Sequence, residues 1–271
     1  MMKRSRKPAV AGSFYPSDSG VLRTTVETLL AEATGQHGGA PLALIAPHAG
    51  YIYSGPVAAS AYACLHAFRE RYRRVVLLGP AHRVALRGIA LPDVEAFETP
   101  LGAIPLDSAA MDELDDPEVD FDDAAHRREH SLEVQLPFLQ VVLDHFSLLP
   151  LLVGATTPKA VARVIDRLWT PPDTLVVVSS DLSHYLPYAE ARQRDSATCR
   201  AIEALDGGAL HGHDACGAAP LRGLLLAARR RGLTARTLDL RNSGDTAGDR
   251  AQVVGYGAWI LTEDETCANA A

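Results

Sequence analysis

The sequence predicts an α/β fold: a single layered domain with a central mixed, largely parallel sheet flanked by helices. Short apolar runs rich in β-branched residues recur without polar alternation, which is typical of strands covered on both faces. Helical patterns separate these runs, and alternating strands and helices favour parallel pairing. The chain has 271 residues, 47% of them hydrophobic and 22% charged, so it can bury a substantial core.

The expected strands coincide with apolar runs that end in turn-forming residues: 42–46, 75–79, 88–91, 148–154, 174–179, 237–240 and 253–261. The expected helices lie between them: 21–32, 56–69, 132–146, 158–168, 188–205 and 220–231. No repeat or change in composition marks a boundary, so we expect one domain over 7–262 and a flexible tail over 263–271. We interpret the acidic stretch 107–123 as a solvated surface helix and loop.

Charge and composition argue against several classes of function. A formal net charge of -7 argues against broad nucleic-acid binding, which needs a basic face. The basic N-terminus is not followed by the apolar run of a signal peptide, and no stretch is apolar enough for a membrane span. Four cysteines without C-x-x-C spacing are read as reduced thiols. We therefore expect a cytoplasmic protein that contacts neither nucleic acid nor membrane.

Side chains that can bind a metal follow three of the expected strands. His48 and His82 each come shortly after one strand, and Asp181 follows a third. In open α/β sheets, ligands bind beyond the carboxyl ends of the strands. Independent structural histidines have no reason to gather at equivalent positions, whereas a metal ion needs ligands from separate rigid elements. The sequence therefore predicts a metal site built from His48, His82 and Asp181.

The predicted ligand set is compatible with several metals. Two imidazoles and one carboxylate are the set that non-haem Fe(II) prefers, and they also suit zinc, manganese or copper. The residues by themselves do not choose among these ions.

Four other residues are assigned to the same crevice. His130 precedes a helical pattern that Ser131 can cap, so it either faces the crevice or is a surface histidine beside a charged loop. His184 lies three residues after Asp181 and is a candidate for proton transfer or for an extra ligand. We assign catalysis to these two histidines.

Substrate binding is assigned to Tyr51 and Asp245. Tyr51 closes the short segment that begins at His48. Asp245 lies in a glycine-bearing segment, 242–249, that either closes the crevice with backbone amides and carboxylates or is a plain polar loop.

Other chemistries have weaker support. The sequence contains no G-x-S-x-G nucleophile elbow, no phosphate-binding G-x-x-x-x-G-K-[ST] loop and no dinucleotide-binding G-x-G-x-x-G. Cys216 is either a nucleophile near a histidine or, as we prefer, a small buried residue. His211 and His213 lack a nearby third partner, so they are weak evidence for a metal site.

Several motifs, taken in order, resemble those of the Memo family, whose prokaryotic members are named AmmeMemoRadiSam system protein B. The motifs are 7–16 (KPAVAGSFYP), 47–51 (PHAGY) with 54–55 (SG), 79–82 (GPAH), 129–138 (EHSLEVQLPF), 179–185 (SSDLSHY) and 216–217 (CG). The resemblance extends from Lys7 to about Leu261, nearly the whole chain.

The resemblance implies a fold like that of the class III extradiol dioxygenases, with non-haem iron in a crevice lined by histidines and a carboxylate. His48 and His82 match the family's metal-binding histidines, and Asp181 matches an acidic residue of the pocket. His130 and His184 match histidines around it. Animal members have a further cysteine ligand where this chain reads Asn242-Ser243-Gly244-Asp245-Thr246, so Asp181 or Asp245 is expected to replace it.

Two main functions follow from the resemblance. The first is a metal-dependent, dioxygenase-like redox enzyme, with iron preferred over copper or zinc and an unidentified small molecule as substrate. The alternative is a non-catalytic metal- or peptide-binding module acting with AMMECR1-type and radical S-adenosylmethionine proteins. A metal-assisted hydrolase is a third interpretation, because the same residues can activate water on zinc.

Overall fold

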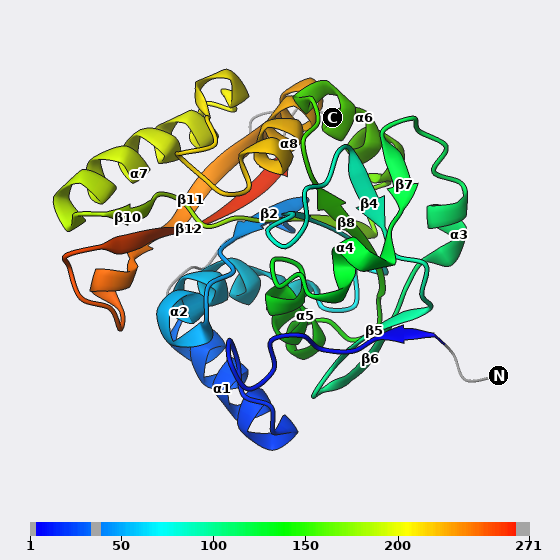
Figure 1. Ribbon diagram of the computed structural model, residues 1–271, viewed down its shortest axis with the longest axis horizontal. Helices are drawn as coiled ribbons and strands as arrows, with labels where there is room; N and C mark the ends of the chain where they lie inside the picture. Colours follow the sequence, from blue (N-terminus) through cyan, green and yellow to red (C-terminus); the bar gives the residue numbers. More distant parts are fainter. Residues whose placement is uncertain (1–3, 34–38, 264–271) are drawn as a thin grey trace.

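A mixed sheet of nine strands forms the centre of the structure, a computed structural model that describes residues 4–33 and 39–263 (Figure 1). In spatial order its strands are β10 (His184–Leu186), β12 (Val253–Glu263), β2 (Ala43–Ala46), β9 (Thr174–Ser179), β3 (Arg74–Pro80), β8 (Ser147–Val153), β4 (Ile89–Leu91) and β7 (Val119–Phe121), and β11 (Leu233–Asn242) pairs with β12.

Parallel pairing is confined to part of this sheet. The four central strands β2, β9, β3 and β8 are parallel to one another, and β4 and β7 also pair in parallel. The pairs β12–β2, β10–β12, β11–β12 and β4–β8 are antiparallel. The predicted mixed α/β architecture is therefore confirmed, with its parallel part at the centre.

Helices cover both faces of the sheet. The longer helices are α1 (Ser19–Glu32), α2 (Tyr51–Tyr62), α5 (Leu136–Val142), α6 (Pro158–Leu168), α7 (Tyr188–Glu203) and α8 (Ala218–Arg230). Shorter ones are α3 (Ser108–Asp112), α4 (Asp123–Arg127) and the 3-10 turns η1 (Ala63–Phe68), η2 (Glu133–Gln135), η3 (Gly207–Ala209) and η4 (Ser243–Asp245). Figure 1 shows α1, α2 and α5 grouped on one side of the sheet and α6, α7 and α8 on the other.

The central strands are apolar on both faces because helices cover both faces. Every residue of β9 is buried, and so is every residue of β2. Trp259 of β12 and Tyr62 of α2 are among the largest fully buried side chains. Strands covered in this way lack polar alternation, which explains the continuous apolar runs in the sequence.

The short strands and the acidic stretch differ from the sequence expectations. A second sheet of β1 (Ser5–Arg6), β5 (Ala96–Thr99) and β6 (Gly102–Pro105) was not predicted. Within 107–123 the chain forms α3 and then β7, an edge strand, where we expected a solvated helix and loop. Asp116 in this stretch is buried against Arg163, 2.6 Å away, and such a long-range ion pair has no signature in local charge pattern.

One buried carboxylate fixes the N-terminal segment to the rest of the molecule. Glu133 accepts hydrogen bonds from the backbone amides of Ala9 and Val10, from the Tyr15 hydroxyl and from the Arg6 guanidinium, at 2.5–2.9 Å. Its side chain is fully buried. These contacts tie the segment 7–16 to the segment 129–138, although more than a hundred residues separate them.

The last strand of the sheet reaches the start of the predicted tail. Of the predicted tail, residues 264–271 lie outside the described residues, and Glu263 ends β12. No helix within 4–33 and 39–263 is both long enough and apolar enough to cross a bilayer. The single-domain assignment stays a prediction, although one sheet draws its strands from Ala43 through Glu263.

Candidate metal centre

The three strands that precede the predicted ligands are neighbours in the sheet. β9 lies between β2 and β3 and is parallel to both, so their carboxyl ends meet at one edge. His48 follows β2 by two residues and His82 follows β3 by two. The centroids of these two imidazole rings are 5.2 Å apart. The strand order therefore brings together two histidines that are 34 positions apart in sequence.

His130 joins them from the loop before η2. One nitrogen from each of His48, His82 and His130 lies within 4.8 Å of the others, which is close enough for one metal ion. The centroid of the His130 ring is 5.5 Å from that of His48 and 4.8 Å from that of His82. His48 is buried, His130 is half-buried and His82 is exposed, so the cluster is open on the His82 side.

Two hydrogen bonds hold the His130 loop against the strand ends. The Ser131 hydroxyl donates to the carbonyl of Pro80, at the end of β3, at 2.8 Å. The Ser179 hydroxyl of β9 donates to the Ser131 carbonyl at 2.6 Å. Gly79 permits this approach, because a Cβ at that position would lie 2.8 Å from the Ser131 hydroxyl oxygen and from a Leu132 methyl group.

The hydrogen bonds of His48 identify its tautomer. Its Nδ1 lies 2.8 Å from the Ser179 hydroxyl oxygen. That hydroxyl gives its only proton to Ser131 and also accepts from the Gln135 side chain, so it accepts from Nδ1–H of His48. Nε2 is thus the ring nitrogen whose lone pair can bind an ion. A fixed Nδ1–H is the usual outer-shell arrangement of a metal-binding histidine.

A single carboxylate lies beside the other two rings. Glu129 is buried, and one of its oxygens lies 3.0 Å from Nδ1 of His82 and 3.1 Å from Nδ1 of His130. The second oxygen accepts from the His82 backbone amide at 2.6 Å. Burial favours the neutral acid, but contacts with His130, His82 and the Ser131 amide outweigh it and lower the pKa of Glu129. Because an ionised carboxylate only accepts, Nδ1 of His82 carries the proton and its Nε2 is free.

The His130 ring is less well satisfied by the protein. Its Nδ1 is buried and, within the described part of the chain, has no hydrogen bond of acceptable geometry despite the nearby Glu129 oxygen. An unsatisfied buried polar atom carries a free-energy cost, so such groups call for an explanation. A metal ion bound to this ring fits that observation.

The electrostatic environment keeps the innermost imidazole neutral. Burial lowers the pKa of His48 to about 4, and its two neighbouring histidines act in the same direction while Asp181 opposes them. A neutral imidazole is the form that binds metals. His48 is therefore ready to bind an ion at neutral pH.

A thiol lies against the same nitrogen. The Cys216 sulfur is 3.3 Å from Nε2 of His48 and accepts from the Asp181 backbone amide, also at 3.3 Å. Gly217 lets this segment approach β9, because a Cβ there would lie 2.6 Å from the Ser180 Cβ. Burial and the Asp181 charge raise the pKa of Cys216 to about 12, which disfavours a nucleophilic thiolate. The protonated Cys216 thiol and a metal ion would therefore compete for the lone pair on Nε2 of His48.

The predicted ligand Asp181 has a different contact from the histidines. One of its carboxylate oxygens accepts from the backbone amide of His48 at 2.7 Å, so it fixes the loop that carries His48. It lies outside the group of residues that meet at one point in the described structure. Its direct bond to a metal stays a prediction. His130, to which we assigned a catalytic role, is in the group.

The remaining predicted residues are not in the cluster. Tyr51 is buried and its hydroxyl donates to the carbonyl of Val134 at 2.8 Å. Asp245 caps η4 through the Asn242 amide and accepts from Tyr188 at 2.6 Å. His184 is exposed, with Nδ1 2.8 Å from the carbonyl of Leu182. The assigned roles of these three residues stay predictions.

Sequence reasoning gave no role to Glu129, Ser179 or Gln135. Glu129 stands next to His130, and a carboxylate beside a candidate ligand is a signal that would have singled it out. Ser179 and Gln135 have no comparable signal, since their roles depend on contacts between β9 and η2.

Comparison with known proteins supports the motif resemblance. Residues 6–260 match the family model described as Memo-like protein. MEMO1 family proteins of Metallosphaera sedula and Aquifex aeolicus are each 38% identical to the chain, and each alignment covers 93% of this chain and 97% of the relative. An uncharacterised protein of Escherichia coli K12 covers 79% of this chain and 98% of its own at 14% identity, with a TM-score of 0.49, a likeness too weak to support an argument. On the family match and the relatives, the chain belongs to the Memo family.

Proposed function

We propose that the protein is a metal-dependent redox enzyme in which His48, His82 and His130 bind a divalent ion, with iron preferred and copper or zinc as alternatives. The observation that carries the proposal is the convergence of three imidazoles within 4.8 Å. Fixed Nδ1–H groups on two of them support it, because they turn Nε2 toward a ligand-binding role. Imidazole ligands suit iron, copper and zinc alike.

We assign roles in the proposed reaction to the residues around the cluster. Iron held by these three histidines would supply one-electron chemistry with dioxygen. His82 is the exposed member of the cluster, so a substrate approaches from its side. His184 donates through Nδ1 to the carbonyl of Leu182, which leaves its Nε2 to accept a proton in the role that we assign to it.

The first test is metal content and oxygen consumption. Protein purified without oxygen should contain about one equivalent of iron by elemental analysis, and His130→Gln should lose most of it. His145→Gln is the matched control, because His145 is exposed and outside the cluster. Oxygen uptake with a panel of catechols then reports on redox activity. Stoichiometric iron without uptake on any phenol would argue against the enzyme and leave the metal site in place.

A second function, a binding module, is favoured by exposed apolar side chains that lie close in sequence to three of the histidines. Ile52 and Tyr185 are each 69% exposed, and Tyr53 and Val84 are partly exposed. They follow His48, His184 and His82 closely in sequence. A peptide, or the AMMECR1-type and radical S-adenosylmethionine partners that the family resemblance implies, would cover them. Loss of partner capture in Ile52→Ser without loss of metal would support this function; turnover without any partner would exclude it as the sole function.

A further inference from the structure

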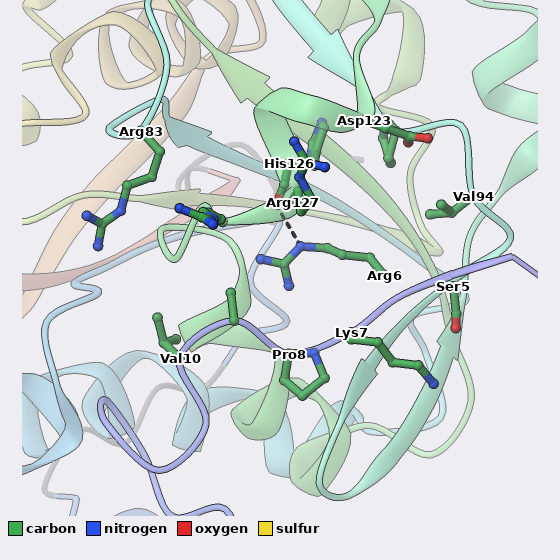
Figure 2. Close-up of a pocket in the computed structure, with 13 residues that line it drawn as sticks. Ser5, Arg6, Lys7, Pro8, Val10, Arg83, Val94, Asp123, His126 and Arg127 are labelled. Carbon is green, nitrogen blue, oxygen red and sulfur yellow. Dashed lines mark hydrogen bonds between the residues drawn. The ribbon is translucent and has the colours of Figure 1, made fainter.

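A cavity of about 820 Å³ lies beside the metal centre, between the N-terminal segment and α4 (Figure 2). Figure 2 shows Arg83 above it, Pro8 and Val10 below it, and Arg6 between them. Pro92 and Val94 add apolar wall. Its size is in the range of small-molecule sites.

Three of the charged groups that line the cavity already have partners. Arg6 is paired with Glu133 at 2.7 Å, and Lys7 is paired with Glu98 at 2.6 Å. The acidic residue of the cavity, Asp123, is paired with Arg4 at 2.8 Å. These pairs leave no negative charge in the cavity for further cations.

The other three charged side chains of the cavity are arginines. Arg83, Arg127 and Arg128 line the cavity and are exposed. Within 4–33 and 39–263, none of the three guanidinium groups forms an ion pair with a carboxylate. This concentration of unpaired positive charge stands out in a chain with a net charge of -7.

A hydrogen bond beside the histidine cluster links the two segments that carry Arg83 and Arg128. The hydrogen bond from the His82 amide to Glu129 is 2.6 Å long, and Arg83 follows His82 directly while Arg128 precedes Glu129. The backbones of the two arginines are therefore fixed close together. Positive charges that line one cavity repel one another, and a bound anion would relieve that repulsion.

We propose that this cavity binds an organic acid whose carboxylate or phosphate is held by Arg83, Arg127 and Arg128. Guanidinium groups recognise such oxyanions with paired hydrogen bonds. The proline, alanine and valine side chains of the cavity fit the apolar body of the ligand. The site is distinct from the histidine cluster and does not depend on a bound metal.

Three probes with the same apolar chain test the site: hexanoate, hexyl phosphate and the neutral hexanol. Metal-free protein is titrated with each by calorimetry. At least one acid should bind more tightly than hexanol, and the stronger acid identifies whether carboxylate or phosphate is preferred. The double variant Arg83→Gln/Arg128→Gln should weaken that acid at least about tenfold, as expected when charge-assisted hydrogen bonds are lost.

The control is Arg229→Gln, which removes one exposed charge near the end of α8 and should leave the affinity unchanged. Circular dichroism verifies that the double variant is folded. Absence of binding by both acids, equal binding of hexanol, or acid binding that survives in the double variant would overturn the proposal. Because no metal is present, each of these outcomes leaves the proposed redox function untouched.

Discussion

Glu129 orients the imidazole of His82 with a buried carboxylate that also lies beside the imidazole of His130. It holds His82 at Nδ1 and at the backbone amide, and it lies beside Nδ1 of His130. Outer-shell carboxylates of this kind fix ring orientation and raise the basicity of the ligand. Glu129 is therefore a positioning residue of the candidate metal centre. Its two carboxylate oxygens already contact His82 and His130, so they do not face the ion.

Replacing this carboxylate should weaken metal binding. We expect Glu129→Gln to lower the affinity for Fe(II) or Zn(II) about 10- to 100-fold, because the amide is nearly isosteric but uncharged. Competition with a chromophoric chelator measures the dissociation constant. An affinity equal to that of the wild type would show that the carboxylate does not support the site. His145→Gln, outside the cluster, should bind metal normally.

His126 makes the stability of the protein sensitive to acid. Burial lowers the pKa of His126 to about 4, and Arg6 acts in the same direction, while the bond to the Ala90 carbonyl and the charges of Asp123 and Asp122 oppose them. The folded state thus binds a proton less readily than the unfolded state. The stability that neutral His126 contributes is full above pH 6.5 and is lost as the pH falls toward 4.

We expect this group alone to account for a loss of about 3 kcal/mol between roughly pH 7 and pH 4. His126→Gln keeps an N–H donor for Ala90 but does not titrate, so its free energy of unfolding should fall less over that range. Urea unfolding at both pH values gives the difference. Equal losses in the two proteins would assign the acid sensitivity to other groups.

At the scale of elements, the candidate site depends on close packing of one loop against two strand ends. The segment with Ser131 is bonded to Pro80 of β3 and to Ser179 of β9. The absence of a side chain at Gly79 leaves room for it. Local preferences do not reveal this packing, because each partner comes from a different part of the chain.

Gly79→Ala should disturb this packing and the metal site together. The added methyl group would lie 2.8 Å from two atoms of the loop, so we expect a loss of about 1–3 kcal/mol in unfolding free energy, as for other overpacked sites. Metal affinity should fall as His130 moves. Chemical denaturation and chelator competition measure the two effects. Gly212→Ala is the matched control, since nothing lies within 4 Å of a Cβ there, and a similar loss in that variant would remove the packing argument.

At the scale of the whole molecule, a bound ion would join three segments that are distant in sequence. His48, His82 and His130 come from the ends of β2 and β3 and from the loop before η2. A preformed cluster of this kind does not exist in the unfolded chain, so metal binding should favour the folded state.

We therefore expect a metal-dependent rise in melting temperature. At a free metal concentration 100 times the dissociation constant, the stabilisation should be about 2.7 kcal/mol. Differential scanning calorimetry with and without Zn(II) measures it, and His48→Ala should abolish most of the shift. A shift of the same size in His48→Ala would place the bound metal elsewhere in the protein.

Local sequence patterns predicted the central strands of the large sheet. The apolar runs predicted β2, β3, β8 and β9 closely because helices cover these strands on both faces. The short strands of the second sheet escaped prediction because two to four residues carry no clear periodicity. Helix α2 begins at Tyr51, earlier than expected, so Pro56 lies inside the helix and does not mark its start.

The sequence by itself determined that His48, His82 and Asp181 follow strand ends, since apolar runs and the turns after them are local properties of the chain. Only the tertiary structure decided which side chains meet: the placement of β9 between β2 and β3, and the hydrogen bonds of Ser131, bring His130 to the two histidines. The same packing gives the carboxylate of Asp181 a backbone amide as its partner. Convergence at a metal site depends on the register of distant segments, and no local pattern encodes that register.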